Sequence, residues 1–231
     1  MFVTALRLVN CLTLRQSHIL RSSIFIALFA IPTTVWAAPK VEVTGSCTEV
    51  SVPDSIKKVL ATQGYRVTLD DGSVVELWPR SEVSGSGKAR DDATYALTAS
   101  VFIGMIHFEK NTRDYRGDAV PAGFYNLRYE LQPNDGNHLG TSPTPDFLLL
   151  TPPSADGDPE HTYSFDQLVD LSRQVTGTKH PAPLNLVPAD AKEAFPSVTT
   201  DPDDHTILFF KAKTQSGELP LALVVKGTTT E

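Results

Sequence analysis

A central β-strand is predicted by the run Ser100-Val101-Phe102-Ile103-Gly104-Met105-Ile106-His107-Phe108. Successive side chains of a strand point to opposite faces of a sheet. Strict alternation would place Val101, Ile103 and Met105 on one face, and Phe102, Ile106 and Phe108 on the other. Because both faces are apolar, we expect this strand to be covered on both sides.

A second strand is predicted over residues 122–131, with a different pattern. Its apolar side chains, Tyr125, Leu127, Tyr129 and Leu131, alternate with polar Asn126, Arg128 and Glu130. This pattern is typical of a strand with one face in the core and the other in water.

Two hairpins and two helices are predicted around these strands. Residues 65–77 form a hairpin about Asp70-Asp71-Gly72, and residues 206–226 form one about Thr214-Gln215-Ser216-Gly217. A short helix is expected over 52–64. A longer one is expected over 163–177, where a capping box of Ser164 and Gln167 precedes an amphipathic stripe that Gly177 ends. Short strands dominate, which predicts a mainly β fold: a single antiparallel β-sandwich, jelly-roll-like, with one or two peripheral helices.

The first 37 residues have the pattern of a secretory signal peptide. Arg7, Arg15 and Arg21 precede an apolar run over 24–31, and Val35 and Ala37 suit the two positions that signal peptidase reads. The apolar run is shorter than the roughly 20 residues that span a bilayer. We therefore expect cleavage after Ala37, export to the periplasm or the extracellular space, and one domain over residues 38–231.

The composition is acidic and argues against nucleic-acid binding. The chain has 27 acidic and 20 basic residues, for a net charge of −7, and the leader removes three arginines but no acid. Affinity for nucleic acid comes from Lys and Arg that neutralise phosphates, and anionic lipid surfaces likewise attract basic segments. An acidic chain is therefore expected to bind neither. No transmembrane segment is predicted after the leader.

Cys47 is the one cysteine outside the leader. It has no partner for an internal disulfide. The functional alternatives for Cys47 are a lipid attachment site, an intermolecular disulfide and a nucleophile. We favour the structural interpretation, in which Cys47 is a small apolar side chain in the core.

The segment Pro121-Ala122-Gly123-Phe124-Tyr125-Asn126-Leu127 has the form P-A-G-x-Y-x-L. Together with residues 147–150 and the terminal hairpin, it resembles a group of exported bacterial β-sandwich domains of unknown function that share this strand motif. The resemblance covers roughly residues 101–226. It implies a fold and a compartment, and it implies no reaction or catalytic residue.

The loop over residues 133–146 is the best candidate site in the sequence. Long loops on a rigid scaffold often carry function. Asp135, Asn137 and Asp146 offer oxygen ligands and His138 a nitrogen, so the loop is predicted to bind a ligand, with a divalent cation as the one cofactor considered. The alternative interpretation is an ordinary polar turn.

The other candidate residues have plainer interpretations. His107 is expected to be a core histidine, and Asp201-Pro202-Asp203-Asp204-His205 a solvated loop. G-x-S-x-G, H-E-x-x-H, C-x-x-C and P-loop motifs are absent from the sequence.

The function that follows is an exported, non-catalytic binding or accessory protein. Its partner would be a small molecule, a glycan or an envelope protein, and no catalytic residue is assigned. One alternative is a metal-assisted hydrolase that uses the 133–146 loop. A purely structural envelope protein is the other.

Overall fold

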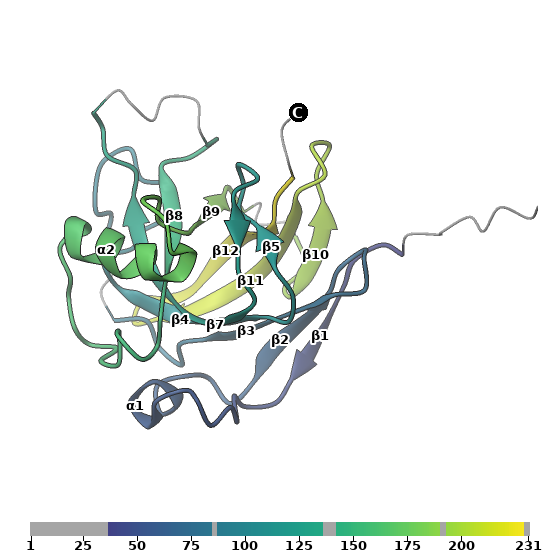
Figure 1. Cartoon of the computed structure of the whole chain (residues 1–231), viewed down its shortest axis with the longest axis horizontal. Coiled ribbons are helices and arrows are strands. Elements are labelled where there is room, and N and C mark those ends of the chain that lie inside the picture. Colours follow the sequence, from purple (N-terminus) through teal and green to yellow (C-terminus); the bar gives the residue numbers. More distant parts are fainter. Residues whose placement is uncertain (1–36, 85–86, 136–141, 190–192, 229–231) are drawn as a thin grey trace, which may run out of the picture. The chain divides into compact units, whose positions relative to one another are not determined.

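The computed structural model describes residues 37–84, 87–135, 142–189 and 193–228 (Figure 1). Within these ranges the chain is mainly β, with two helices, so the predicted fold class is confirmed. The helices are α1 (Asp54–Lys57) and α2 (Phe165–Thr176).

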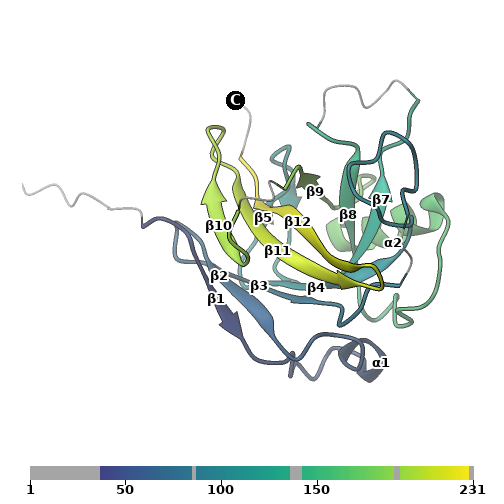
Figure 2. The same ribbon diagram turned by 180° about the vertical axis from the view of Figure 1, so that it is seen from behind.

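Ten strands of the described residues form one antiparallel sheet. Their order across the sheet is β1 (Lys40–Thr44), β2 (Gly64–Thr68), β3 (Val74–Pro79), β4 (Phe102–Phe108), β7 (Gly123–Leu131), β8 (Asp146–Thr151), β9 (Pro183–Val187), β12 (Gly217–Lys226), β11 (Thr206–Thr214) and β10 (Ser197–Thr200). The edge strands β1 and β10 contact each other, so the sheet curls until it is nearly closed (Figure 2). The two layers expected of a sandwich are thus two halves of one continuous sheet. A separate hairpin consists of β5 (Thr112–Arg113) and β6 (Ala119–Val120).

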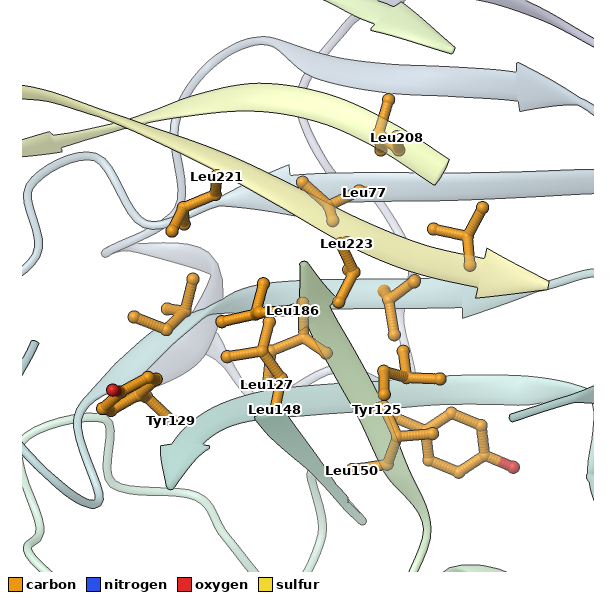
Figure 3. Close-up of a cluster of buried hydrophobic side chains, with 14 of the residues drawn as sticks. Leu77, Tyr125, Leu127, Tyr129, Leu148, Leu150, Leu186, Leu208, Leu221 and Leu223 are labelled. Atoms are coloured by element: carbon orange, nitrogen blue, oxygen red, sulfur yellow. The ribbon is translucent and has the colours of Figure 1, made fainter. Parts of the chain in front are cut away.

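The main core lies between the two halves of the sheet. Leu127, Leu148 and Leu186 come from β7, β8 and β9, and they pack in one cluster with Leu77 of β3 and Leu223 of β12 (Figure 3). All five side chains are at most 1% exposed. This contact between strands far apart in sequence is what buries the apolar face of each half.

Strand β4 is central and apolar on both faces, as predicted, but its face assignment was wrong. Ile103, Ile106 and Phe108 lie in the main core, whereas Phe102 and Met105 pack on the outer side. The register with β7 shifts between Phe102 and Gly104, and a bulge of this kind interrupts the alternation of side chains.

Gly104 fits this bulge because it has no side chain. A Cβ atom on Gly104 would lie 2.4 Å from the carbonyl oxygen of Trp78 and 2.8 Å from the Cα atom of Pro79. Close approach of two backbones is a common reason for glycine within a strand.

The predicted 65–77 hairpin is confirmed. Tyr65 pairs with Leu77 and Val67 with Val75 across β2 and β3. Gly72 has a φ of 76° in the connecting turn, a left-handed conformation that glycine adopts without a steric penalty.

The helix expected over 52–64 is much shorter, because only α1 is helical. After α1 the backbone forms hydrogen bonds with the last residue of β3 and with the segment that follows it. The amide of Ala61 donates to the backbone oxygen of Pro79, and the amide of Ser81 donates to the backbone oxygen of Val59. Tertiary hydrogen bonds therefore replace the helical ones.

Helix α2 begins and ends where the sequence predicts. The side chain of Ser164 accepts from the amide of Gln167, the Gln167 side chain accepts from the amide of Ser164, and Gly177 closes the helix in the left-handed conformation. Leu168 and Val169 pack on Phe147 and Leu149 of β8, so α2 covers the outer face of that strand (Figure 1).

The face of β7 that was predicted to be wet is buried. Asn126 and Arg128 are 0% exposed and Glu130 is 7% exposed. The segment around Asp156 covers Asn126 and Arg128, and its polar groups replace the water that those side chains would otherwise meet. Alternation identified the two faces of the strand, but not what covers the polar one.

Across the part of the chain that the structure describes, no helix has the length and apolar character needed to cross a bilayer.

Candidate functional site

The site begins with the tight turn of the β5–β6 hairpin, residues 114–118. One carboxylate oxygen of Asp114 accepts from the amides of Arg116 (3.0 Å) and Asp118 (2.9 Å). The amide of Gly117 donates to the backbone oxygen of Asp114 (3.0 Å), and Gly117 has a φ of 86°. A single buried carboxylate therefore holds the backbone amides of Arg116 and Asp118 in place.

Two further contacts hold this turn. The guanidinium of Arg113 donates to the backbone oxygen of Gly117 at 2.7 Å. The ring of Tyr115 stacks on His205, with ring centroids 4.3 Å apart. The backbone that carries Arg116 and Asp118 is thus fixed on both sides, which is the preorganisation that a binding site requires.

A groove of about 140 Å³ lies between this turn, helix α2 and the outer faces of β8 and β9. The apolar side chains in its lining include Phe147, Leu149, Phe165 and Val169, which we call its floor. The polar residues in its lining are Asp114, Arg116, Asp118, Gln132, His180 and Asn185, and we call the exposed Arg116, Asp118 and His180 its rim. We call this the α2 groove. An apolar cavity with a few polar groups at its edge is the usual form of a small-molecule site.

The rim groups are available to a ligand. Arg116, Asp118 and His180 are exposed, and within the described ranges none of their side chains has a hydrogen-bond or ion-pair partner. A neighbouring cavity of about 250 Å³ shares Asp118 and His180 and continues past Thr176 at the end of α2. The polar rim therefore extends beyond the apolar floor.

Asp114 lies beneath the rim and is 3% exposed. Burial raises the pKa of its carboxyl, although the amides of Asp118 and Arg116 oppose that effect. Its role is to hold the turn, because its oxygen is already engaged by those two amides.

Two other cavities are less suited to a ligand. One of about 230 Å³ lies beside Arg128, whose guanidinium is fully engaged with Asp156 and backbone oxygens. Another of about 350 Å³ lies beside Lys226, which is paired with Asp70 and Asp71. Their charged groups already have partners.

The residues that the sequence predicted as a site are only partly described. Asn137 and His138 lie outside the described residues. Asp146 is the first residue of β8 and is 0% exposed. Its carboxylate accepts from the amides of Thr94 and Tyr95 and from the hydroxyl of Tyr129 at 2.6 Å. Asp135 is exposed, and a shared ligand set in this loop stays a prediction.

A cluster that the sequence suggested only as a solvated loop brings three potential ligand atoms together. Those of Asp201, Asp203 and His205 lie within 4.8 Å of one another. Asp201 accepts from the amides of Asp203 and His205 and from the ring of His205 at 2.9 Å. These hydrogen bonds cap the turn that precedes β11, which accounts for the cluster without an ion.

The contacts of His107 and Cys47 indicate structural roles for both residues. His107 stacks on Phe124, with centroids 3.9 Å apart, and its Nδ1 lies 3.2 Å from a carboxylate oxygen of Glu76. Cys47 is 8% exposed in an apolar cluster with Trp78. Burial raises the pKa of its thiol, which disfavours the reactive thiolate.

Sequence reasoning missed the α2 groove. Arg116 and Asp118 stand on a hairpin with two residues in each strand, too short to give a periodic signal. The one available signal was Gly117 between two charged residues, which is typical of an exposed turn.

A scan against protein-family models, a search of curated proteins and a search of solved structures found no match for this chain. The resemblance based on the P-A-G-x-Y-x-L motif therefore stays a prediction, and the geometry of the site is what bears on function.

Proposed function

We propose that this chain is an exported, non-catalytic binding protein that holds a small ligand in the α2 groove. The observation that carries the proposal is the apolar floor of Phe147, Leu149, Phe165 and Val169 beside unpaired polar groups on a fixed turn. Such a floor favours an apolar group, and the rim gives orientation. The leader pattern over residues 1–37 supports export.

A fragment screen tests the binding role. Small aromatic and aliphatic compounds are added to the protein, and binding is measured by thermal shift and by NMR chemical-shift changes. Val169→Phe should fill the groove and abolish binding. The matched control is Val50→Phe, because Val50 is 90% exposed and does not line the groove. A second variant, Phe165→Ala, enlarges the groove and should weaken binding of small fragments.

The outcome separates this proposal from its alternatives. Unchanged binding in Val169→Phe and Phe165→Ala, or no binding by any fragment, would contradict it. The hydrolase alternative instead requires a divalent metal that copurifies and is lost in the combined variant Asp135→Ala, His138→Ala, which leaves the buried Asp146 in place. A structural envelope protein would show neither a ligand nor a metal.

Export has its own test. The intact mass of the protein recovered from a secreting host should correspond to a chain that begins at Ala38. Retention of residues 1–37 would contradict export through a cleaved leader, and a lipid mass on Cys47 would replace it with membrane anchoring.

A further inference from the structure

The rim of the α2 groove carries one positive and one negative side chain on the same tight turn. Arg116 and Asp118 both line the groove, and their amides share one acceptor oxygen of Asp114. Among the described residues, no ion pair joins the two side chains to each other or to a third group. Each charge therefore has unused hydrogen-bonding capacity.

This arrangement discriminates between ligands by charge. A ligand with only a carboxylate would pair with Arg116 but meet the like charge of Asp118. A ligand with only an ammonium would pair with Asp118 but meet Arg116. Specificity can come from a repulsive contact with the wrong ligand as well as from a favourable contact with the right one. A zwitterion satisfies both groups at once.

The size of the groove limits the apolar part of the ligand. The cavity is about 140 Å³, close to the roughly 150 Å³ of an engineered apolar cavity that binds benzene. The side chains of Phe147 and Phe165 supply aromatic surface to it, and aromatic pairs gain free energy beyond area burial. One ring or a branched aliphatic group fits this space.

We infer that the α2 groove binds an amino acid with an apolar side chain, whose carboxylate pairs with Arg116 and whose ammonium pairs with Asp118. This inference rests on the proposed binding function and specifies the ligand class of that site. The apolar side chain occupies the floor of Phe147, Leu149, Phe165 and Val169. No bond is made or broken, so the site needs no cofactor.

The test compares four probes that share a phenyl ring and differ in their charged groups. They are L-phenylalanine, 3-phenylpropanoate, which lacks the ammonium, 2-phenylethylamine, which lacks the carboxylate, and benzyl alcohol, which has neither charge. Isothermal titration calorimetry gives the Kd of each. L-Phenylalanine should bind at least about tenfold more tightly than either singly charged probe, since a hydrogen bond to a charged group corresponds to tenfold or more in affinity.

Two variants assign the charges. Arg116→Gln should weaken the binding of L-phenylalanine and of 3-phenylpropanoate but not the binding of 2-phenylethylamine. Asp118→Asn should weaken the binding of L-phenylalanine and of 2-phenylethylamine but not the binding of 3-phenylpropanoate. The controls Lys213→Gln and Asp54→Asn remove exposed charges outside the groove and should change none of the four values.

Failure of this inference can be told apart from failure of the proposed function. If benzyl alcohol or a singly charged probe binds as tightly as L-phenylalanine, and Val169→Phe abolishes that binding, the ligand class is wrong and the groove still binds. If none of the four probes binds, the ligand class is again wrong, and the fragment screen alone then decides whether the groove is a site.

Discussion

The guanidinium of Arg128 on β7 forms a two-pronged pair with the carboxylate of Asp156, from Nε to Oδ2 at 2.9 Å and from Nη2 to Oδ1 at 2.6 Å. Its remaining N–H groups donate to the backbone oxygens of Ser100, His161 and Asp158. Both charged side chains are at most 1% exposed. The pair therefore fastens the 152–163 segment to the outer face of the sheet.

Breaking this pair should destabilise the protein strongly. Asp156→Ala leaves the charge of Arg128 buried and unpaired, and the free energy of unfolding should fall by about 3–5 kcal/mol. Arg128→Lys should also destabilise, because an ammonium lacks the planar fork that engages two oxygens. Chemical denaturation measures both changes.

The matched control is the exposed pair of Arg173 and Asp170, whose side chains are 45% and 71% exposed. Asp170→Ala should cost less than about 0.5 kcal/mol. Equal losses in Asp156→Ala and Asp170→Ala would show that the buried pair does not fasten the segment.

Asp156 should also make the protein sensitive to acid. Burial by itself raises the pKa of its carboxyl, but hydrogen bonds from Arg128 and Thr151 outweigh burial and hold that pKa below its usual value. A carboxyl with a lowered pKa in the folded state contributes stability above its unfolded pKa of about 3.9, and this stability is lost as the pH falls through the folded pKa. The difference in unfolding free energy between the parent and Asp156→Asn should therefore shrink as the pH drops below about 4. A constant difference would contradict the assignment.

Glu130 should have the opposite dependence on pH. It is 7% exposed, and burial raises the pKa of its carboxyl, with partial opposition from the amide of Leu131 and the charge of Arg90. A carboxyl with a raised pKa favours folding below its unfolded pKa, and stability is lost as the pH rises through the folded pKa. Glu130→Gln keeps the oxygen that accepts from the amide of Leu131.

We expect Glu130→Gln to stabilise the protein at pH 7 by on the order of 1 kcal/mol, since it removes a buried charge. Urea denaturation at pH 4 and pH 7 measures this gain, which should disappear at pH 4. A loss of stability at pH 7 would show that the carboxylate has a favourable partner.

The faces of β4 and β7 can be tested together. Ile103 is 0% exposed in the main core, so Ile103→Ala should cost about 2–5 kcal/mol. From the alternating pattern alone, Asn126→Ala would cost less than about 0.5 kcal/mol. Since Asn126 is 0% exposed and donates to the backbone oxygen of Asp156 at 2.7 Å, we expect Asn126→Ala to lower the free energy of unfolding by about 1–3 kcal/mol. Thr199→Ala on the exposed part of β10 is the control and should be nearly neutral.

Local signals explain what the sequence could predict. The capping box and the final glycine of α2 lie within the helix they define, and the turn at Gly72 needs only neighbouring residues. These elements follow from interactions close in the chain, so they appear where the sequence predicts them.

The errors come from contacts between distant residues. The polar face of β7 is buried because Asp156 pairs with Arg128 and covers it. The two residues are 28 positions apart in the chain, so no local pattern reports the contact. The bulge in β4 depends on the close approach of Gly104 to Trp78 on another strand. The α2 groove likewise forms only where Arg116 of a short hairpin and Phe165 of a helix line the same cavity. Periodicity reports which face is polar, but it does not report what covers that face.

Asp114 connects the stability of the hairpin to the proposed binding site. Asp114→Ala removes the oxygen that accepts from the amides of Arg116 and Asp118, and two unsatisfied amides should cost about 1–3 kcal/mol. Asp114→Asn keeps an oxygen acceptor and removes a buried carboxylate charge. Burial disfavours that charge, since it raises the pKa of the Asp114 carboxyl. We therefore expect Asp114→Asn to be as stable as the parent or more stable at pH 7.

Binding distinguishes a positioning role for Asp114 from a purely structural one. Asp114→Ala should weaken any ligand that needs both Arg116 and Asp118, while a probe that contacts only the apolar floor should keep its Kd. Asp114→Asn should restore the affinity of the first ligand, because an oxygen again holds the backbone amides of Arg116 and Asp118. Calorimetry at a temperature where both variants are folded gives these values. Equal weakening of both probes in Asp114→Ala would mean that the turn supports the whole groove rather than the placement of its two charges.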